Sequence, residues 1–250
     1  MFKRIPLISL VVYLMAWGLT APATAQALLP YTLQLEPKQL EEQSLGLIQE
    51  AIALSRFQQS DLAIARAQLA TQLAPKDYKP WFLLGSLQAE AQKWDQAIES
   101  LQRAKTLAAK ANQAPVYFSI GSAYFQKGDY QGAASELQAG LQLQPDNPEA
   151  LFDLGNTYYK LNRYPDAIAQ YQKVVAKDPK FWAAINNIGL VKYEQGDVDG
   201  AIVEWRKAIA IDAKAAEPTL AIAIALYGKG QQTDGVATGI KAVNLDKRYA

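Results

Sequence analysis

Apolar and small residues recur at helical spacing between residues 148 and 181. One stripe at i, i+3, i+4 and i+7 consists of Leu151, Leu154, Gly155 and Tyr158. After an interruption at residues 162–165, a second stripe follows at Ala167, Tyr171 and Val174. The segment ends at Asp178-Pro179, because proline lacks an amide donor and keeps the preceding residue out of helical geometry. The pattern predicts a helix, a turn and a second helix.

The same pattern returns when the window moves by about one repeat length in either direction. One register holds glycine at Gly85, Gly121, Gly155 and Gly189, and another holds alanine at Ala63, Ala97, Ala133, Ala167 and Ala201. Glycine within a helix costs about 1 kcal/mol relative to alanine, so its recurrence indicates close packing of the two helices. Six copies fit, with two extra residues near 110–113, at 44–77, 78–113, 114–147, 148–181, 182–215 and 216–249.

The copy at 148–181 resembles the repeat of the tetratricopeptide (TPR) family, through small residues at Gly155 and Ala167 and a closing Pro179. The likeness covers nearly everything from Ser44 onward. It implies an all-α fold, a right-handed solenoid of about six helix-turn-helix repeats. It also implies that the fifth, ninth and twelfth residues of each repeat line a concave groove. It does not indicate which partner binds there, because the family has many unrelated partners.

These groove registers hold aromatic side chains with small polar residues between them. Tyrosine in particular offers apolar area and a hydroxyl group at low entropic cost, which suits the binding of a peptide segment. An alternative interpretation is that the aromatic rings only shield contacts between helices. The predicted partner-binding residues are Phe82, Ser86, Phe118, Ser122, Phe125, Phe152, Asn156, Tyr159, Asn186, Tyr193 and Tyr227.

One binding mode of the family is not expected here. Members that clamp a C-terminal carboxylate have lysine where Phe152 stands, and lysine and arginine where Glu217 and Ala221 stand. Of the clamp positions, Asn156 and Asn187 alone match. The sequence therefore argues against recognition of chaperone tails.

The N-terminal 25 residues read as an export signal. Lys3 and Arg4 precede an apolar stretch at 5–20, and Ala23-Thr24-Ala25 forms a site for cleavage before Gln26. The alternative is an uncleaved membrane anchor at 5–21, only slightly short of a bilayer span. Either way the repeats should be exported, to the periplasm or a thylakoid lumen. Residues 26–43 are predicted to be a linker and the start of the first helix, and residues 44–250 the solenoid.

Composition narrows the possible functions. Without Lys3 and Arg4 the basic residues number 23 (25 minus 2) against 24 acids, so we expect neither nucleic acid nor an anionic lipid surface as a partner. The chain contains no histidine and no cysteine, which removes the commonest general base, thiol chemistry and the commonest transition-metal ligands. We predict a non-enzymatic protein without a cofactor or metal.

The last repeat departs from the pattern. It is crowded by glycines that lower helix stability, at Gly228, Gly230, Gly235 and Gly239. We therefore predict that residues 235–250 form the least protected helical stretch. A second copy of the chain could associate through this end.

The sequence thus predicts a protein-interaction scaffold that binds a partner segment in its groove. The alanine- and glutamine-rich helices and the closing KAVNLDKRYA resemble those of cyanobacterial members of the family. That resemblance implies an assembly factor for membrane complexes, in photosystem or pigment-protein biogenesis. Two alternatives remain: a structural scaffold of the cell envelope, associated with pili or the cell wall, and a self-assembling spacer.

Overall fold

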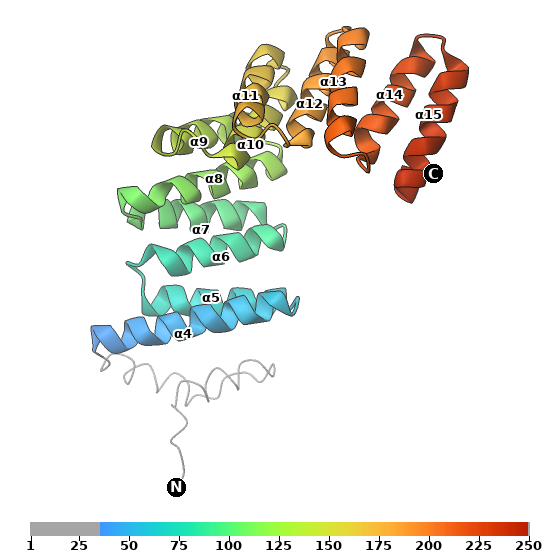
Figure 1. The fold of residues 1–250 in the computed structure, drawn as a ribbon. Coiled ribbons are helices and arrows are strands. Elements are labelled where there is room, and N and C mark those ends of the chain that lie inside the picture. The colour runs from blue at the N-terminus through green and yellow to red at the C-terminus, as the bar shows by residue number, and fades with distance from the viewer. Residues whose placement is uncertain (1–35, 250) are drawn as a thin grey trace. The chain divides into compact units, whose positions relative to one another are not determined.

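The computed structural model describes residues 36–249, and this part of the chain is entirely helical. It contains twelve α-helices and one short 3-10 helix, with no strand between residues 36 and 249. The helices form six successive hairpins (Figure 1), which confirms the predicted all-α fold of helix-turn-helix repeats. The predicted export segment and most of the linker lie outside the described residues. Within 36–249, no helix combines the length and hydropathy needed to cross a membrane.

The chain divides into two compact units, Met1–Ala108 and Ala109–Ala250. The described part of the first unit contains two hairpins, formed by α4 (Pro37–Arg56), α5 (Ser60–Leu73), α6 (Tyr78–Glu90) and α7 (Trp94–Leu107). The second unit contains four, formed by α8 (Lys110–Lys127), α9 (Tyr130–Leu143), α10 (Pro148–Lys160), α11 (Tyr164–Lys177), α12 (Trp182–Glu194), α13 (Val198–Ile211), α14 (Ala216–Gly228) and α15 (Gln232–Leu245). The 3-10 helix Lys247–Tyr249 follows α15. The two extra residues of the second copy fall near 110–113, in the first turn of α8.

Local sequence sets the ends of these helices. At the start of α10, the side chain of Asn147 accepts a hydrogen bond from the amide of Ala150 at 2.8 Å, and Pro148 occupies the first turn, where its missing amide is not needed. Between α8 and α9, Gly128 adopts φ +89°, a left-handed conformation that favours glycine, and Asp129 caps α9. Asn147 and Pro148 thus begin a new hairpin, and Gly128 and Asp129 form the turn inside the hairpin α8/α9.

The recurrent glycine of each inner hairpin lies against a large side chain of the second helix. Built onto Gly85, Gly121, Gly155 and Gly189, a Cβ atom would come 2.5–2.7 Å from a side-chain atom of Leu101, Leu137, Tyr171 and Trp205 respectively. Such a distance is far below van der Waals contact. The glycines are therefore required because a bulky residue sixteen positions later occupies the space of their side chain.

The core of the second unit is continuous through its middle hairpins. Leu137 of α9, Leu154 of α10, Val174 of α11 and Val191 of α12 belong to one buried cluster. Because each hairpin shares this core with its neighbour, α10, α11 and α12 hold one another in place. The side chains on their outer surfaces are therefore presented by a fixed framework.

Candidate functional site

The predicted groove residues are distributed over both units. Phe82 and Ser86 lie on α6 of the first unit, where the hydroxyl of Ser86 donates to the carbonyl of Phe82 at 2.9 Å. The other predicted residues lie on α8, α10, α12 and α14 of the second unit, and we refer to this set as the aromatic row. Its members are Phe118, Ser122, Phe125, Phe152, Asn156, Tyr159, Asn186, Tyr193 and Tyr227.

Most rings of the aromatic row are half-buried, because each packs against a second ring. The pairs and their centroid separations are Phe125 with Tyr130 at 5.3 Å, Phe152 with Phe181 at 5.2 Å, Tyr159 with Tyr164 at 6.0 Å and Tyr193 with Trp205 at 5.8 Å. Edge-on and tilted contacts of this kind add to the stability of the hairpins. The rings therefore shield helix contacts and still keep part of their surface accessible.

The ends of the row differ from its middle. Phe118 fills the space beside Gly140 of α9, and Ser122 is exposed. Tyr227, on the last hairpin, keeps 55% of its surface exposed. The structure thus gives the inner rings a packing role that Tyr227 lacks.

Three asparagines and one tyrosine form a hydrogen-bonded group in the middle of the row, which we call the asparagine cluster. The Oδ1 atom of Asn156 accepts from the Tyr171 hydroxyl at 2.8 Å and from Nδ2 of Asn187 at 2.9 Å. The Nδ2 atom of Asn186 in turn donates to Oδ1 of Asn187 at 3.2 Å. The cluster therefore links α10, α11 and α12.

Sequence reasoning placed Asn156 and Asn186 in the row but missed the role of Tyr171. A signal was present: Tyr171 stands in the register that holds Leu101, Leu137 and Trp205 in other hairpins, and it alone brings a hydroxyl group there. Burial raises the pKa of Tyr171, so its hydroxyl stays protonated and donates. That donor fixes the orientation of the Asn156 amide.

The fixed Asn156 amide retains hydrogen-bonding capacity. Both of its hydrogen bonds use Oδ1, and its Nδ2 atom donates to no residue within the described range. An amide nitrogen carries two N–H groups, which suit the carbonyl oxygens of an extended chain. Asn156, Asn186 and Asn187 are all half-buried rather than enclosed. The cluster is thus a preorganised donor group that a ligand can reach.

Acidic side chains border the asparagine cluster. Burial by its neighbours, reinforced by the negative charge of Glu149 one turn earlier, raises the pKa of Asp153 to about 6, although part of this side chain stays exposed. On the next turns of α10 and α12, the Tyr159 hydroxyl approaches Glu194 at 3.4 Å, and burial together with that carboxylate raises the pKa of Tyr159. The electrostatics of this surface therefore disfavour an acidic ligand.

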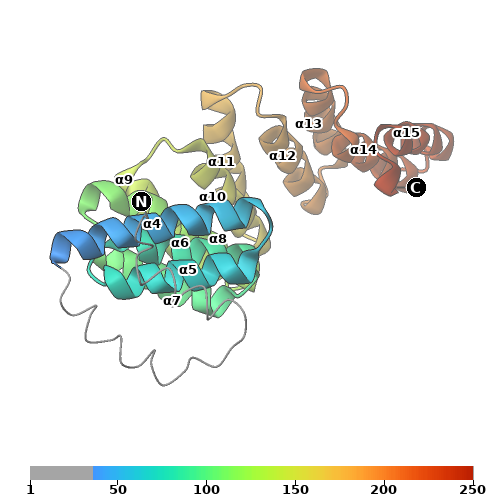
Figure 2. The ribbon, with the colours of Figure 1, turned by 90° about the horizontal axis from the view of Figure 1, so that it is seen from below.

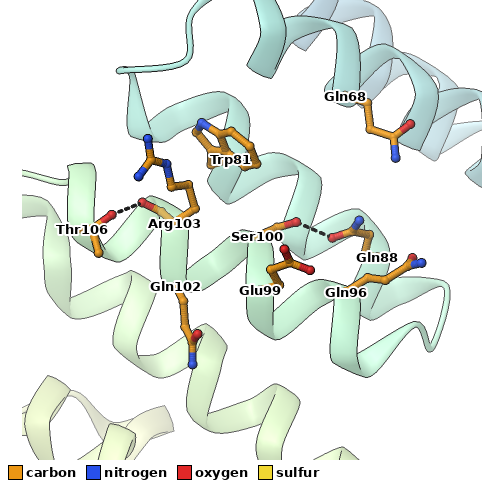
Figure 3. Close-up of a pocket in the computed structure, with 9 residues that line it drawn as sticks. All are labelled: Gln68, Trp81, Gln88, Gln96, Glu99, Ser100, Gln102, Arg103 and Thr106. Carbon is orange, nitrogen blue, oxygen red and sulfur yellow. Dashed lines mark hydrogen bonds between the residues drawn. The ribbon is translucent and has the colours of Figure 1, made fainter.

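A separate hollow of ≈ 560 Å³ lies in the first unit, and sequence reasoning did not anticipate it. Figure 3 shows its lining from α5, α6 and α7, which consists of Gln68, Trp81, Gln88, Gln96, Glu99, Ser100, Gln102, Arg103 and Thr106. On its floor the buried Ser100 hydroxyl donates to Oε1 of the buried Gln88 at 2.7 Å. Ser100 is shorter than Glu136, Gln170 and Glu204, which stand in the same register of three later hairpins.

This hollow has the composition of a polar contact surface. Its amides and hydroxyls are neutral hydrogen-bonding groups, and the indole nitrogen of Trp81 is already used in a bond to the carbonyl of Pro75 at 3.2 Å. No histidine or cysteine is available to act as a base or nucleophile. In the part of the chain that the structure describes, no group of acidic side chains is arranged to hold a metal ion.

Paired helices, small residues matched to large ones and a side-chain row on the first helices together define an all-α fold of repeated helical hairpins. Sequence comparison agrees over the second unit: residues 124–188 match the model described as "Tetratricopeptide repeat", and residues 189–230 match "TPR repeat". Residues 21–112 match the model described as "ChAPs (Chs5p-Arf1p-binding proteins)". The search of curated proteins finds no match.

Solved structures share the fold. A crystal structure of MamA protein is 26% identical, with a TM-score of 0.63, covering 70% of this chain and 95% of that chain. MamA 41-end from Desulfovibrio magneticus RS-1 is 17% identical, with a TM-score of 0.64, covering 69% and 97% respectively. YrrB, described as "a TPR protein with an unusual peptide-binding site", is 19% identical, with a TM-score of 0.62, covering 84% and all of that chain.

Proposed function

We propose that this protein is a non-enzymatic scaffold whose second unit binds an extended segment of a partner protein along the aromatic row. The observation that carries the proposal is the asparagine cluster. Tyr171 and Asn187 hold the carboxamide of Asn156 by its oxygen, and this leaves the two N–H groups for an incoming carbonyl. An extended chain presents unpaired backbone carbonyls of the kind that such a donor satisfies.

The surroundings define the chemistry of the segment. The half-buried rings of Phe152, Tyr159 and Tyr193 offer apolar area on α10 and α12, which suits a hydrophobic or amphipathic stretch. Asp153 and Glu194 place negative charge beside those rings, and they would repel an acidic partner and attract a basic one. We therefore expect apolar side chains flanked by lysine or arginine in the bound segment.

The finer proposal is that this segment belongs to a subunit of a membrane complex, and that the protein assists assembly, as in photosystem or pigment-protein biogenesis. Its support is the expected export or anchoring of residues 1–25 and the resemblance to cyanobacterial members of the repeat family. The description of YrrB as a peptide-binding repeat protein is compatible with the binding mode. We place the binding unit in the periplasm or thylakoid lumen, free or held at the membrane by residues 5–21.

Site-specific photo-crosslinking in the native host tests the proposal. A photoreactive residue replaces Tyr159 or Tyr193, and the captured peptides are identified by mass spectrometry. We expect both positions to capture the same partner segment, and the Asn156→Ala variant to lose most of this capture. A photoreactive residue at Gln172, an exposed position of α11 outside the row, is the matched control and should not capture it.

The identity of the captured protein decides the finer proposal. Subunits of a photosystem or enzymes of pigment synthesis support the assembly role, whereas pilus or cell-wall proteins favour an envelope scaffold. Equal capture from Tyr159 and Gln172, or capture that is indifferent to Asn156→Ala, contradicts binding along the row.

A further inference from the structure

The last hairpin leaves an apolar face uncovered. Ile224 and Tyr227 of α14 and Val236 and Ile240 of α15 keep 54%, 55%, 53% and 58% of their surfaces exposed. Ala223, Gly235 and three of these residues line a shallow, almost entirely apolar hollow of ≈ 250 Å³. In Figures 1 and 2, α15 is the outermost helix of the second unit. Isolated exposed apolar residues are ordinary, but a contiguous group marks an interaction surface.

Ile240 of this face is apolar, although its repeat register is otherwise occupied by polar residues. The residue equivalent to Ile240 is exposed in every other hairpin, and there it is Gln68, Gln102, Gln138, Gln172 or Arg206. Ile240 is thus an apolar residue at a place that the repeat otherwise keeps hydrophilic. Neither the packing of α15 on α14 nor the repeat pattern requires it.

A second residue of the face belongs to a register that is used for stacking. The equivalents of Val236 pack on the first helix of the following hairpin: Ile64 shares a buried cluster with Leu87, and Ile202 shares one with Ala225. Each pair joins the second helix of one hairpin to the first helix of the next. Val236, which is also β-branched and in the same register, is exposed and packs on no further hairpin within the described residues.

The first helix of the chain carries the complementary half of this contact. Ala53 of α4 is in the register of Leu87 and Ala225. Gly46 lies seven residues earlier on the same face of α4, in the register of the buried Ala150 and Ala184. Ala53 and Gly46 are exposed, and a side chain on Gly46 would meet nothing within 4 Å. Small residues at seven-residue spacing allow another helix to approach closely.

Charge at the two ends is also complementary. Glu42 precedes Gly46 by one turn on the same stripe of α4, and Lys247 begins the 3-10 helix that follows α15. Stacked helices of adjoining hairpins run antiparallel, so a contact that pairs Val236 with Ala53 brings the chain end after α15 toward the first turns of α4, where Glu42 lies. Both charged residues are exposed.

We propose that two molecules of this chain associate head to tail, with α15 of one molecule packing on α4 of a second in the manner of two successive hairpins. The occupant is a second copy because the chain itself carries both halves of an interface that it already builds between its own hairpins. Such a contact is heterologous, so it can extend into a row of molecules. The exposed face shares Tyr227 with the aromatic row, but the inference rests on α15 and α4 and does not require binding along that row.

Cross-linking of single-cysteine variants tests this contact, since the natural chain contains no cysteine. Full-length Ala53→Cys and Val236→Cys proteins in mild detergent are mixed and treated with a short bismaleimide. We expect a cross-linked dimer from the mixture and little from either variant alone. Cross-linking of Val236→Cys with itself, or the absence of any dimer, would overturn the proposal. A variant that carries both cysteines is also tested, and a link that forms only within single molecules of it would likewise overturn the proposal.

A substitution that restores the repeat pattern gives a second test. Ile240→Gln introduces the residue found in four other hairpins, so melting should stay unchanged while association, measured by analytical ultracentrifugation, weakens about tenfold. Ile211→Gln, at an exposed isoleucine of α13, is the matched control and should leave association unchanged. If Ile240→Gln lowers the melting temperature and not the association, the face is covered within one molecule and the proposal fails.

Discussion

The hairpins α10/α11 and α14/α15 follow the same repeat plan within one unit, but their second helices are held differently. In α11 the ring of Tyr171, 1% exposed, fills the space above Gly155, and Ala167 and Val174 are also buried. In α15 the register of Tyr171 is Gly239, and the buried residues are Gly235 and Ala242. No large side chain anchors the last helix.

The difference shows how one repeat can serve two purposes. Tyr171 both fixes α11 and orients Asn156, so the middle of the unit combines stability with a preorganised donor. In the last hairpin, Gly235 instead lets the helices approach until a Cβ atom would lie 2.9 Å from the amide nitrogen of Tyr227. Burial there is small, and the apolar side chains remain on the outside.

The largest effect is expected from Tyr171→Ala. This change removes the ring that packs on Gly155 and Phe152 and leaves a cavity, so the free energy of unfolding should fall by about 3–5 kcal/mol. Urea denaturation of the two proteins measures the loss. A loss below 1 kcal/mol would mean that Tyr171 does not anchor α11.

Gly155→Ala should destabilise the same hairpin, because the added methyl group overpacks the space between α10 and α11. The added methyl group would meet the Tyr171 ring at 2.5 Å, and the cost of overpacking, about 1–3 kcal/mol, exceeds the gain in helix propensity. The same denaturation experiment tests it. An unchanged or increased stability would show that the ring can move aside.

Asn156→Ala should weaken binding more than folding. Loss of a fixed donor to a carbonyl should lower affinity for the captured segment about tenfold, measured by calorimetry with the synthetic peptide. Gln172→Ala, at an exposed position of α11 outside the row, is the control and should bind as the natural protein does. Equal affinities of the natural protein and the Asn156 variant would remove the cluster from the binding surface.

A glycine-to-alanine change in the second helix of the last hairpin should act in the opposite direction to Gly155→Ala. At Gly239 the new methyl group would find Ala223 Cβ at 3.8 Å, an ordinary contact, so Gly239→Ala should stabilise α15 by about 0.5–1 kcal/mol through helix propensity. Amide exchange of α15 gives the local change. Destabilisation by Gly239→Ala would mean that α15 packs more closely on Ala223 than the 3.8 Å contact indicates.

The smallest effect concerns pH. In the folded chain the pKa of Asp153 is about 6, above the ordinary value of 3.8, so the folded state holds the proton more tightly than the unfolded chain. The contribution of Asp153 to stability therefore declines as pH rises from about 4 through 6. The free energy of unfolding is measured against pH for the natural protein and for Asp153→Asn. The difference between the two profiles should isolate this decline. A difference that stays flat across this window would contradict the raised pKa.

The sequence was sufficient for the fold because its signal is periodic. The glycines at 85, 121, 155 and 189 each precede their partner side chain by sixteen residues, and this spacing alone specifies the hairpin. Only part of the asparagine cluster could be predicted from the sequence. Its members Asn156, Tyr171 and Asn187 are separated by 15 and 16 residues and lie on three helices. The hollow beside Ser100 could not be predicted from the sequence, since the repeat pattern does not indicate where a short side chain leaves a space.

Hydrogen exchange of the full chain, with and without the captured segment, is the most direct test of the central claim that the middle hairpins form the binding framework. In the free protein, diluted until it is monomeric, we expect the slowest exchange in α10, α11 and α12 and the fastest helical exchange in α15. Binding should slow the amides of α10 and α12 further and leave α15 unchanged. Protection that appears only in α15, or an α15 as slow as α11 before binding, would contradict the account.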